Sequence, residues 1–184
     1  IVSGGGAQAT RAQLEAVLPR FIGDIAQIPP MYSALKRDGQ KLCDLARQGI
    51  DVKVEPRPTQ VYAIDVLHEN EDGSFILQIR CGRGTYIRTL CNDIGEALGT
   101  KAHMGVLLRT QTGMFTLDDA HTIEEIDAAE DLTPLLVAMD KPLGHLPRLD
   151  VQPKAERFVR NGNKLTRREL IGDIQPGKPT RLYL

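Results

Sequence analysis

The sequence has few cysteines, almost no net charge and no long apolar run, and each of these shortages argues against a class of protein. Its three cysteines show no C-x-x-C spacing, which argues against a disulfide framework or a zinc site and favours reduced thiols in a cytoplasmic protein. The net charge is −1, so any contact with nucleic acid must use local basic patches. No run approaches the length of a membrane span, and no signal-peptide pattern is present.

Hydrophobic periodicity predicts an α+β fold. The 184 residues, 41% of them hydrophobic, are enough for one domain, or for one domain with a partial second. Residues 59–68 and 74–81 are β-rich, and Asp72-Gly73 between them predicts a hairpin. Thr10 and Gln13 form a capping box that predicts the start of a helix. We therefore expect a mixed sheet that includes both strands and carries helices at its faces or rim.

Shorter signals predict further elements along the chain. Residues 41–48 are expected to form a short helix closed by Gly49, and residues 154–160 another, ended by Asn161-Gly162. The stretch 104–117 is expected to contribute more strand, with a break at Thr112-Gly113.

The stretch from Cys81 to Leu90 joins a predicted strand to a predicted helix. Apolar residues recur at helical spacing from Ile87, and Thr85 is the predicted N-cap, which places Tyr86 and Arg88 in the first turn. An arginine there opposes the helix dipole, so the stability of the helix does not account for it. A nearby carboxylate or phosphate that pairs with the arginine would account for it. Two interpretations stay open from this stretch: an ordinary connection with a solvated arginine, or a site for an anionic group.

Three segments, in their order and spacing, resemble the TruB-type tRNA pseudouridine synthases. They are Gln27-Ile28-Pro29-Pro30-Met31-Tyr32-Ser33-Ala34-Leu35-Lys36 with the residues up to Gly49, then Gly84-Thr85-Tyr86-Ile87-Arg88-Thr89-Leu90, and the run from Gly99 to Arg109. The resemblance implies that residues 10–144 are the C-terminal part of the catalytic domain, with an RNA-gripping insertion at 27–49. Residues 145–184 would then be a partial PUA-like RNA-binding domain, and the glycine-rich residues 1–9 a linker.

The resemblance also implies an activity and a partner. Such an isomerase converts the T-loop uridine at tRNA position 55 to pseudouridine, by flipping the base and using one aspartate, without a metal or organic cofactor. The implied partner is the T stem-loop of tRNA, with no membrane and no obligate protein partner, and the full-length enzyme is expected to be a monomer. The family's aspartate lies in a G-x-L-D-P-x-A-T-G motif, and this sequence has no Asp-Pro dipeptide. Because the chain also begins without methionine, we expect it to be the C-terminal portion of such an enzyme, inactive alone.

The family's functional residues can be carried over by position. Tyr86 matches the tyrosine that lines the uridine pocket, Arg88 the arginine that pairs with the catalytic aspartate, and Leu107 a leucine that closes the pocket. Six basic residues and one acidic residue fall between Lys154 and Arg168, which predicts either a solvated surface or a phosphate-binding patch. The residues expected to contact RNA are Lys36, Arg37, Lys41 and Arg47 in the insertion, and Arg157, Arg160, Arg167 and Arg168 near the end.

Two alternatives from other classes stay open. The chain can be a non-catalytic fragment that binds tRNA, or a half-enzyme that needs a second chain to supply the aspartate. The sequence before Ile1 discriminates them, because a G-x-L-D-P-type segment there indicates an enzyme and an unrelated fusion indicates a binding module.

Overall fold

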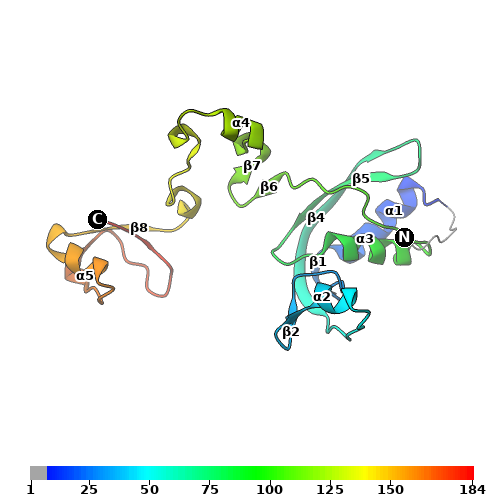
Figure 1. Ribbon diagram of the computed structural model, residues 1–184, viewed down its shortest axis with the longest axis horizontal. Helices are drawn as coiled ribbons and strands as arrows, with labels where there is room; N and C mark the ends of the chain where they lie inside the picture. Colours follow the sequence, from blue (N-terminus) through cyan, green and yellow to red (C-terminus); the bar gives the residue numbers. More distant parts are fainter. Residues whose placement is uncertain (1–7) are drawn as a thin grey trace. The chain divides into compact units, whose positions relative to one another are not determined.

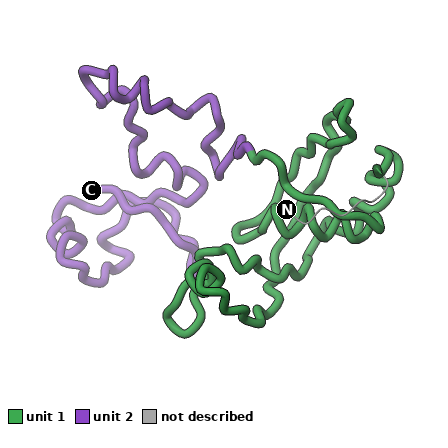
Figure 2. Tube along the Cα trace, turned by 45° about the vertical axis from the view of Figure 1, so that its right-hand side comes forward, with its two compact units in different colours: residues 1–107 green, residues 108–184 purple. Residues whose placement is uncertain are grey.

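The computed structural model describes residues 8–184, which form two compact units (Figure 2). Unit 1 ends at Leu107, and unit 2 runs from Leu108 to Leu184. The linker predicted at residues 1–9 falls almost entirely outside the described residues. The boundary predicted at residue 144, between a catalytic and an RNA-binding part, stays a prediction.

Unit 1 is built on a three-stranded antiparallel sheet with the strand order β1-β4-β5. The strands are β1 (Gly23–Gln27), β4 (Arg57–Glu69) and β5 (Phe75–Cys81). The predicted hairpin between β4 and β5 is confirmed, and Gly73 supplies the positive φ of 77° in its turn. Alternate residues of β5 point to the core and to solvent, as its sequence pattern predicts.

Two helices pack on one face of this sheet (Figure 1). They are α1 (Arg11–Val17), continued by the 3-10 turn η1 (Leu18–Phe21), and α3 (Ile87–Ala97). The capping box at Thr10 is confirmed, because the Thr10 hydroxyl accepts from the Gln13 N–H and the Gln13 side chain accepts from the Thr10 N–H. The buried core joins α1, η1, β4 and α3 through Leu14, Val17, Leu18, Val61, Ile64, Leu90 and Ile94.

The segment at 27–49 contains a small hairpin and a short helix. The hairpin pairs β2 (Lys36–Arg37) with β3 (Gln40–Lys41), and its turn uses the positive φ of Asp38 and Gly39. The helix predicted before Gly49 is confirmed as α2 (Leu42–Arg47), which buries Leu42 and Leu45.

Unit 2 begins with short elements and ends in a second small sheet. The hairpin of β6 (Gln111–Thr112) and β7 (Phe115–Thr116) turns at Gly113, so the predicted break is confirmed, but the strand predicted across 104–110 is wrong. Those residues find no partner strand among the described residues, and without a ladder an apolar run does not become a strand. The remaining elements up to residue 143 are η2 (Leu117–Asp119), α4 (Ile123–Ala128), η3 (Thr133–Leu135) and η4 (Lys141–Leu143).

The C-terminal sheet has the order β10-β8-β9. Strand β8 (Arg148–Val151) pairs parallel with β10 (Arg181–Tyr183) and antiparallel with β9 (Leu170–Ile171). Between β8 and β9 lie η5 (Pro153–Ala155), α5 (Glu156–Arg160) and η6 (Arg167–Glu169), so the predicted helix is confirmed. The α+β class is therefore confirmed. The sheet that contains the two predicted strands, β4 and β5, is antiparallel in the described residues and not mixed as expected, and mixed pairing occurs instead in this C-terminal sheet.

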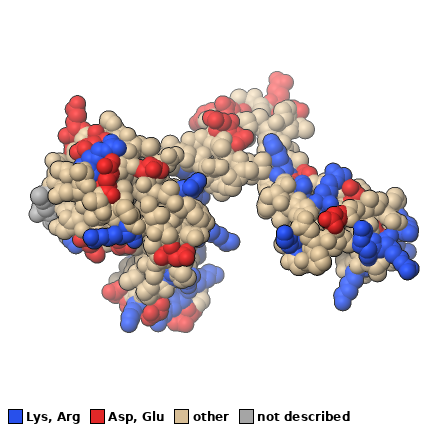
Figure 3. Space-filling view, turned by 180° about the vertical axis from the view of Figure 1, so that it is seen from behind, with Lys and Arg blue, Asp and Glu red and all other residues tan. Residues whose placement is uncertain are grey.

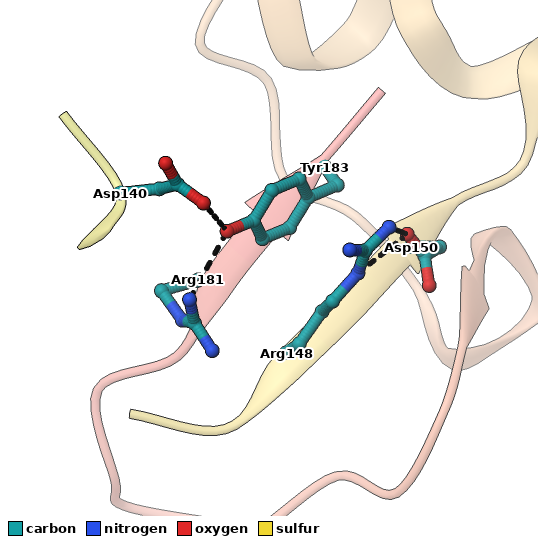
Figure 4. Close-up of polar contacts among 5 residues, drawn as sticks. All are labelled: Asp140, Arg148, Asp150, Arg181 and Tyr183. Atoms are coloured by element: carbon teal, nitrogen blue, oxygen red, sulfur yellow. Dashed lines mark hydrogen bonds and ion pairs between the residues drawn. The ribbon is translucent and has the colours of Figure 1, made fainter. Parts of the chain in front are cut away.

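A polar cluster fixes the last strand, β10 (Figure 4). The Tyr183 hydroxyl donates to the Asp140 carboxylate and accepts from Arg181 Nη1 at 3.1 Å. The Arg148 guanidinium lies 4.0 Å from the centre of the Tyr183 ring and donates two hydrogen bonds to Asp150. The hydrogen bond from Tyr183 lowers the pKa of Asp140 below its usual value of 3.8.

Candidate active site

Tyr86 and Arg88 lie at the start of α3, directly after the loop that leaves β5. The N-cap is Tyr86, with φ −94° and ψ 101°, so the N-cap predicted at Thr85 is wrong. The Thr85 hydroxyl turns back to the sheet, where it donates to Gly82 O at 3.0 Å and lies 2.6 Å from the Thr59 hydroxyl. These tertiary contacts compete with capping for the same hydroxyl, and they fix the loop against β4.

The side chain that bonds to this N-cap residue comes from β1. Gln27 Oε1 accepts from the Tyr86 N–H at 2.9 Å, and Gln27 Nε2 donates to Tyr86 O at 3.2 Å. Gln27 is the last residue of β1, and only 2% of it is exposed. Sequence reasoning missed this residue, because a contact between positions 59 apart leaves no local signal.

Arg88 is exposed and donates through Nη2 to the backbone oxygen of Tyr32 at 2.8 Å. No carboxylate of residues 8–184 forms an ion pair with it. A guanidinium has a planar fork of N–H donors, so one bond to a carbonyl leaves donors for a bidentate carboxylate or phosphate. The half-buried Tyr86 lies two residues away, which places an aromatic group and a cation in the same helical turn.

Leu107 lies in the stretch 101–110, which forms neither helix nor strand, and 54% of it is exposed. Its assignment as the leucine that closes a uridine pocket stays a prediction.

The basic residues of the insertion are exposed on its hairpin and helix. Lys36 and Lys41 face each other across the β2–β3 ladder, so two like charges are held together on a small hairpin. Arg37 is hydrogen-bonded to the backbone oxygen of Lys53, and Arg47 to Asp44 at 3.2 Å. Neither lysine forms an ion pair within residues 8–184, and two adjacent like charges favour an anionic partner.

The second basic group lies on α5 and η6, in the C-terminal part of unit 2, where blue side chains gather in Figure 3. Arg160 pairs with Glu156 at 2.7 Å, and Arg167 donates to the backbone oxygens of Leu170 and Gly172. Arg157 and Arg168 are exposed and form no ion pair within residues 8–184. A surface hollow beside α5 is lined by Pro153, Lys154, Glu156, Arg157, Arg160 and Asn161.

Across residues 8–184, no cluster of three or more His, Cys, Asp or Glu side chains is arranged to hold a metal ion. The cysteines are half-buried free thiols, and burial raises the pKa of Cys91. None of the described helices combines the length and the apolar character needed to cross a membrane.

Comparison with known proteins places most of the chain in two adjacent family domains. Residues 3–87 match the model described as the N-terminal domain of the TruB family pseudouridylate synthases. Residues 88–143 match the model described as the C-terminal domain of tRNA pseudouridylate synthase B. The second match begins within α3, so the candidate site lies at the junction of the two matches.

Individual relatives agree with these matches. A protein of Alkaliphilus oremlandii named tRNA pseudouridine synthase B is 44% identical over 92% of this chain and 57% of its own length. A protein of Dechloromonas aromatica with the same name is 45% identical over 85% of this chain and 52% of its own length. The chain thus spans about half the length of the curated relatives it matches.

Solved structures show the same fold. The chain is similar, with a TM-score of 0.65 and 29% identity, to a chain in the crystal structure of a Cbf5-Nop10-Gar1 complex. That similarity covers 86% of this chain and 46% of the other. A chain of an H/ACA RNP structure matches with a TM-score of 0.68 over 96% of this chain and 51% of its own length, at 23% identity.

Proposed function

Because the chain belongs to the TruB family of pseudouridylate synthases, we propose that it is part of an isomerase that modifies tRNA. Its substrate is the T-loop uridine at tRNA position 55, and its product is pseudouridine. Support comes from the relatives named tRNA pseudouridine synthase B and from the Tyr86–Arg88 turn at the start of α3. Two separate regions are proposed to grip RNA: the segment 27–49 in unit 1, and the arginines of α5 and η6 in unit 2.

The reaction breaks the bond between ribose C1′ and uracil N1, rotates the base and rejoins it through C5. The uridine is stacked within a folded loop, so the enzyme must flip it out and hold it while the ring turns. Tyr86 offers an aromatic face for this stacking and a hydroxyl for hydrogen bonding. The carboxylate that acts on the nucleoside is an aspartate from a segment outside this sequence.

The observation that carries the proposal is the environment of Arg88. It is a guanidinium in the first turn of a helix, where the dipole opposes a cation, and it lacks a carboxylate partner among residues 8–184. A catalytic aspartate is the anion that completes this arrangement. The paired guanidinium orients that carboxylate with two hydrogen bonds and holds its pKa low, so that it stays ionised.

The experiment uses the complete protein that contains this chain, with a tRNA transcript as substrate. We expect one pseudouridine to form, at position 55, as mapped by mass spectrometry of nuclease fragments. A transcript with cytidine at that position is the matched control and should stay unmodified. Binding of the transcript without any pseudouridine contradicts the proposal and indicates a tRNA-binding module. Activity that appears only when a second chain carrying the aspartate motif is added indicates a half-enzyme.

A further inference from the structure

Gln27 is one of only two polar residues, with Ser33, that the described part of the chain buries almost completely. Burial of an amide is unfavourable unless its donor and acceptor are both bonded. Both are bonded here, and to a single residue: the Gln27 amide accepts from the N–H of Tyr86 and donates to its carbonyl. Gln27 is therefore a polar side chain in the interior. Within the described residues, all its side-chain hydrogen bonds go to the backbone of Tyr86, the residue proposed to stack on the base.

These two bonds hold the N-cap residue itself, and neither is a capping bond to the free N–H groups of the first turn of α3. Tyr86 has no side-chain capping bond, and its carbonyl also accepts the first helical bond, from the Leu90 N–H at 3.0 Å. The Gln27 amide therefore holds Tyr86 by the backbone groups on both sides of its Cα. With both groups held, β1 contributes to the direction in which the Tyr86 side chain leaves the backbone, together with the loop that precedes α3.

The residues after Gln27 continue along the same helical turn. The Thr89 hydroxyl donates to Ile28 O at 3.3 Å, and Arg88 donates to Tyr32 O at 2.8 Å. The stretch 27–32 thus contacts three of the first residues of α3, at Tyr86, Arg88 and Thr89. Of these contacts the Gln27 pair is part-buried and the other two are exposed, so the Gln27 pair is the better protected from solvent.

We propose that Gln27 is a positioning residue for the isomerisation, which acts through the backbone of Tyr86. The inference rests on the proposed function, because it takes Tyr86 and Arg88 to contact the target uridine and the catalytic aspartate. Loss of the amide frees the Tyr86 backbone and misplaces the first turn of α3. Small misplacements of reacting groups slow the chemical step strongly. Gln27 is the first residue of the RNA-gripping segment 27–49, but its side chain is buried and bonds only to Tyr86, so the exposed basic residues proposed to contact RNA should keep their contacts.

Two substitutions separate positioning from a role in folding alone. Gln27→Met keeps the length of the side chain and removes both hydrogen bonds. Gln27→Glu keeps both while the acid is protonated, because a carboxylic acid has one donor and one acceptor, as the amide has. The ionised acid has acceptors only, so it cannot donate to the Tyr86 carbonyl, and the two oxygens repel each other. Burial raises the pKa of such a carboxyl, which brings the change into a pH range that an enzyme assay can reach.

The test measures single-turnover pseudouridine formation by the complete protein with a T stem-loop RNA, at saturating enzyme and below the unfolding temperature of each variant. We expect Gln27→Met to be about 10- to 100-fold slower than wild type, with the dissociation constant for RNA changed by less than about threefold. The rate of Gln27→Glu relative to wild type should rise as the pH is lowered. Gln78→Met, an exposed position on β5, is the matched control and should react normally.

A near-normal rate for folded Gln27→Met overturns the inference, as does a Gln27→Glu to wild-type ratio that stays flat with pH. If Gln27→Met does not fold, the pH series of Gln27→Glu decides alone. Failure of the proposed function is distinguishable, because wild type then makes no pseudouridine. An active wild type with an equally active Gln27→Met counts against the positioning role only.

Discussion

The start of α3 depends on two side chains with different roles. Gln27 is buried and bonds only to backbone, whereas Arg88 is exposed and has donors to spare for an anion. A buried side chain such as Gln27 can fix the geometry of the backbone that it bonds to. An exposed guanidinium such as Arg88 can bind an anionic group. Gln27 from β1 and Arg88 from α3 both act at the first turn of α3, and this makes the turn a candidate for catalysis.

A residue-scale prediction concerns the hydrogen bond from Tyr183 to Asp140. This bond lowers the pKa of Asp140 in the folded protein, so it stabilises the fold above the usual carboxyl value of 3.8, and the stabilisation is lost as the pH falls through the lowered pKa. Tyr183→Phe should therefore lower the melting temperature at neutral pH, and the difference from wild type should disappear in acid. Thermal unfolding followed by circular dichroism across that pH range measures this.

The matched control for that series is Tyr62→Phe, an exposed tyrosine on β4. It should shift the melting temperature little and by the same amount at every pH. If the melting temperature of Tyr183→Phe differs from that of wild type by the same amount at every pH, the Tyr183 hydroxyl does not stabilise the ionised Asp140 carboxylate.

Residues whose signals are local were predictable, and residues defined by distant contacts were not. The capping box at Thr10, the Asp72-Gly73 turn and the helix end at Gly49 each follow from a few neighbouring residues, and all three are confirmed. Thr85 has the side chain of an N-cap, but its hydroxyl bonds to Gly82 and Thr59. Gln27 has no signal in its neighbourhood, because its role depends on a strand and a helix far apart in sequence.

At the scale of elements, the arginines of α5 and η6 differ in how much charge they can offer to RNA. Arg160 pairs with Glu156 and Arg167 bonds to two backbone oxygens, whereas Arg157 and Arg168 are exposed without an ion pair in the described residues. The sequence alone predicts a patch of equivalent charges. All four are exposed, and the structure divides them into a pair bonded to neighbouring groups of the protein and a pair without an ion pair in the described residues.

We predict that replacing Arg157, Arg160, Arg167 and Arg168 by glutamine weakens tRNA binding and flattens its salt dependence. Each lost phosphate contact should reduce the slope of log K against log salt by about 0.7–0.9. The chemical step on bound substrate should change little. Filter binding over a salt series, with single-turnover kinetics at saturating enzyme, measures both.

The two pairs provide an internal control for that experiment. The double change at Arg157 and Arg168 should reduce the slope more than the double change at Arg160 and Arg167. Equal effects would show that the internal contacts of the second pair do not limit its contact with RNA. An unchanged affinity and slope in the quadruple variant would identify the patch as a solvated surface.

At the scale of the whole molecule, apolar surface is left uncovered in the described residues. Strand β5 is an outer strand of the unit 1 sheet. Between Val106 and Leu143 many large apolar side chains are exposed, with Val106, Ile123, Leu136 and Met139 among the most exposed. Unpaired strand edges and contiguous apolar surface promote association with other copies.

We therefore predict that a protein of residues 1–184 alone self-associates as its concentration rises, whereas the complete protein stays monomeric. Size-exclusion chromatography with light scattering, on both proteins over the same concentration range, measures the mass of each. Changing Val106 and Met139 to serine in the shorter protein should reduce its association. A shorter protein that is monomeric and unfolds in one cooperative transition would show that the described residues form a self-sufficient fold.

The central claim is that the first turn of α3 belongs to an active site in which Arg88 pairs with a catalytic aspartate. Its most direct test is single-turnover pseudouridine formation by the complete protein carrying Arg88→Ala, at saturating enzyme. The prediction is a loss of at least about 10²-fold in rate, the scale seen when one electrostatic partner is removed from an active site, with tRNA binding changed much less. Arg88→Lys should restore the rate only in part, because an ammonium lacks the planar two-donor fork. Arg20→Ala, an exposed arginine on η1, is the matched control and should react normally. A near-normal rate for Arg88→Ala would contradict the assignment of this turn to the active site.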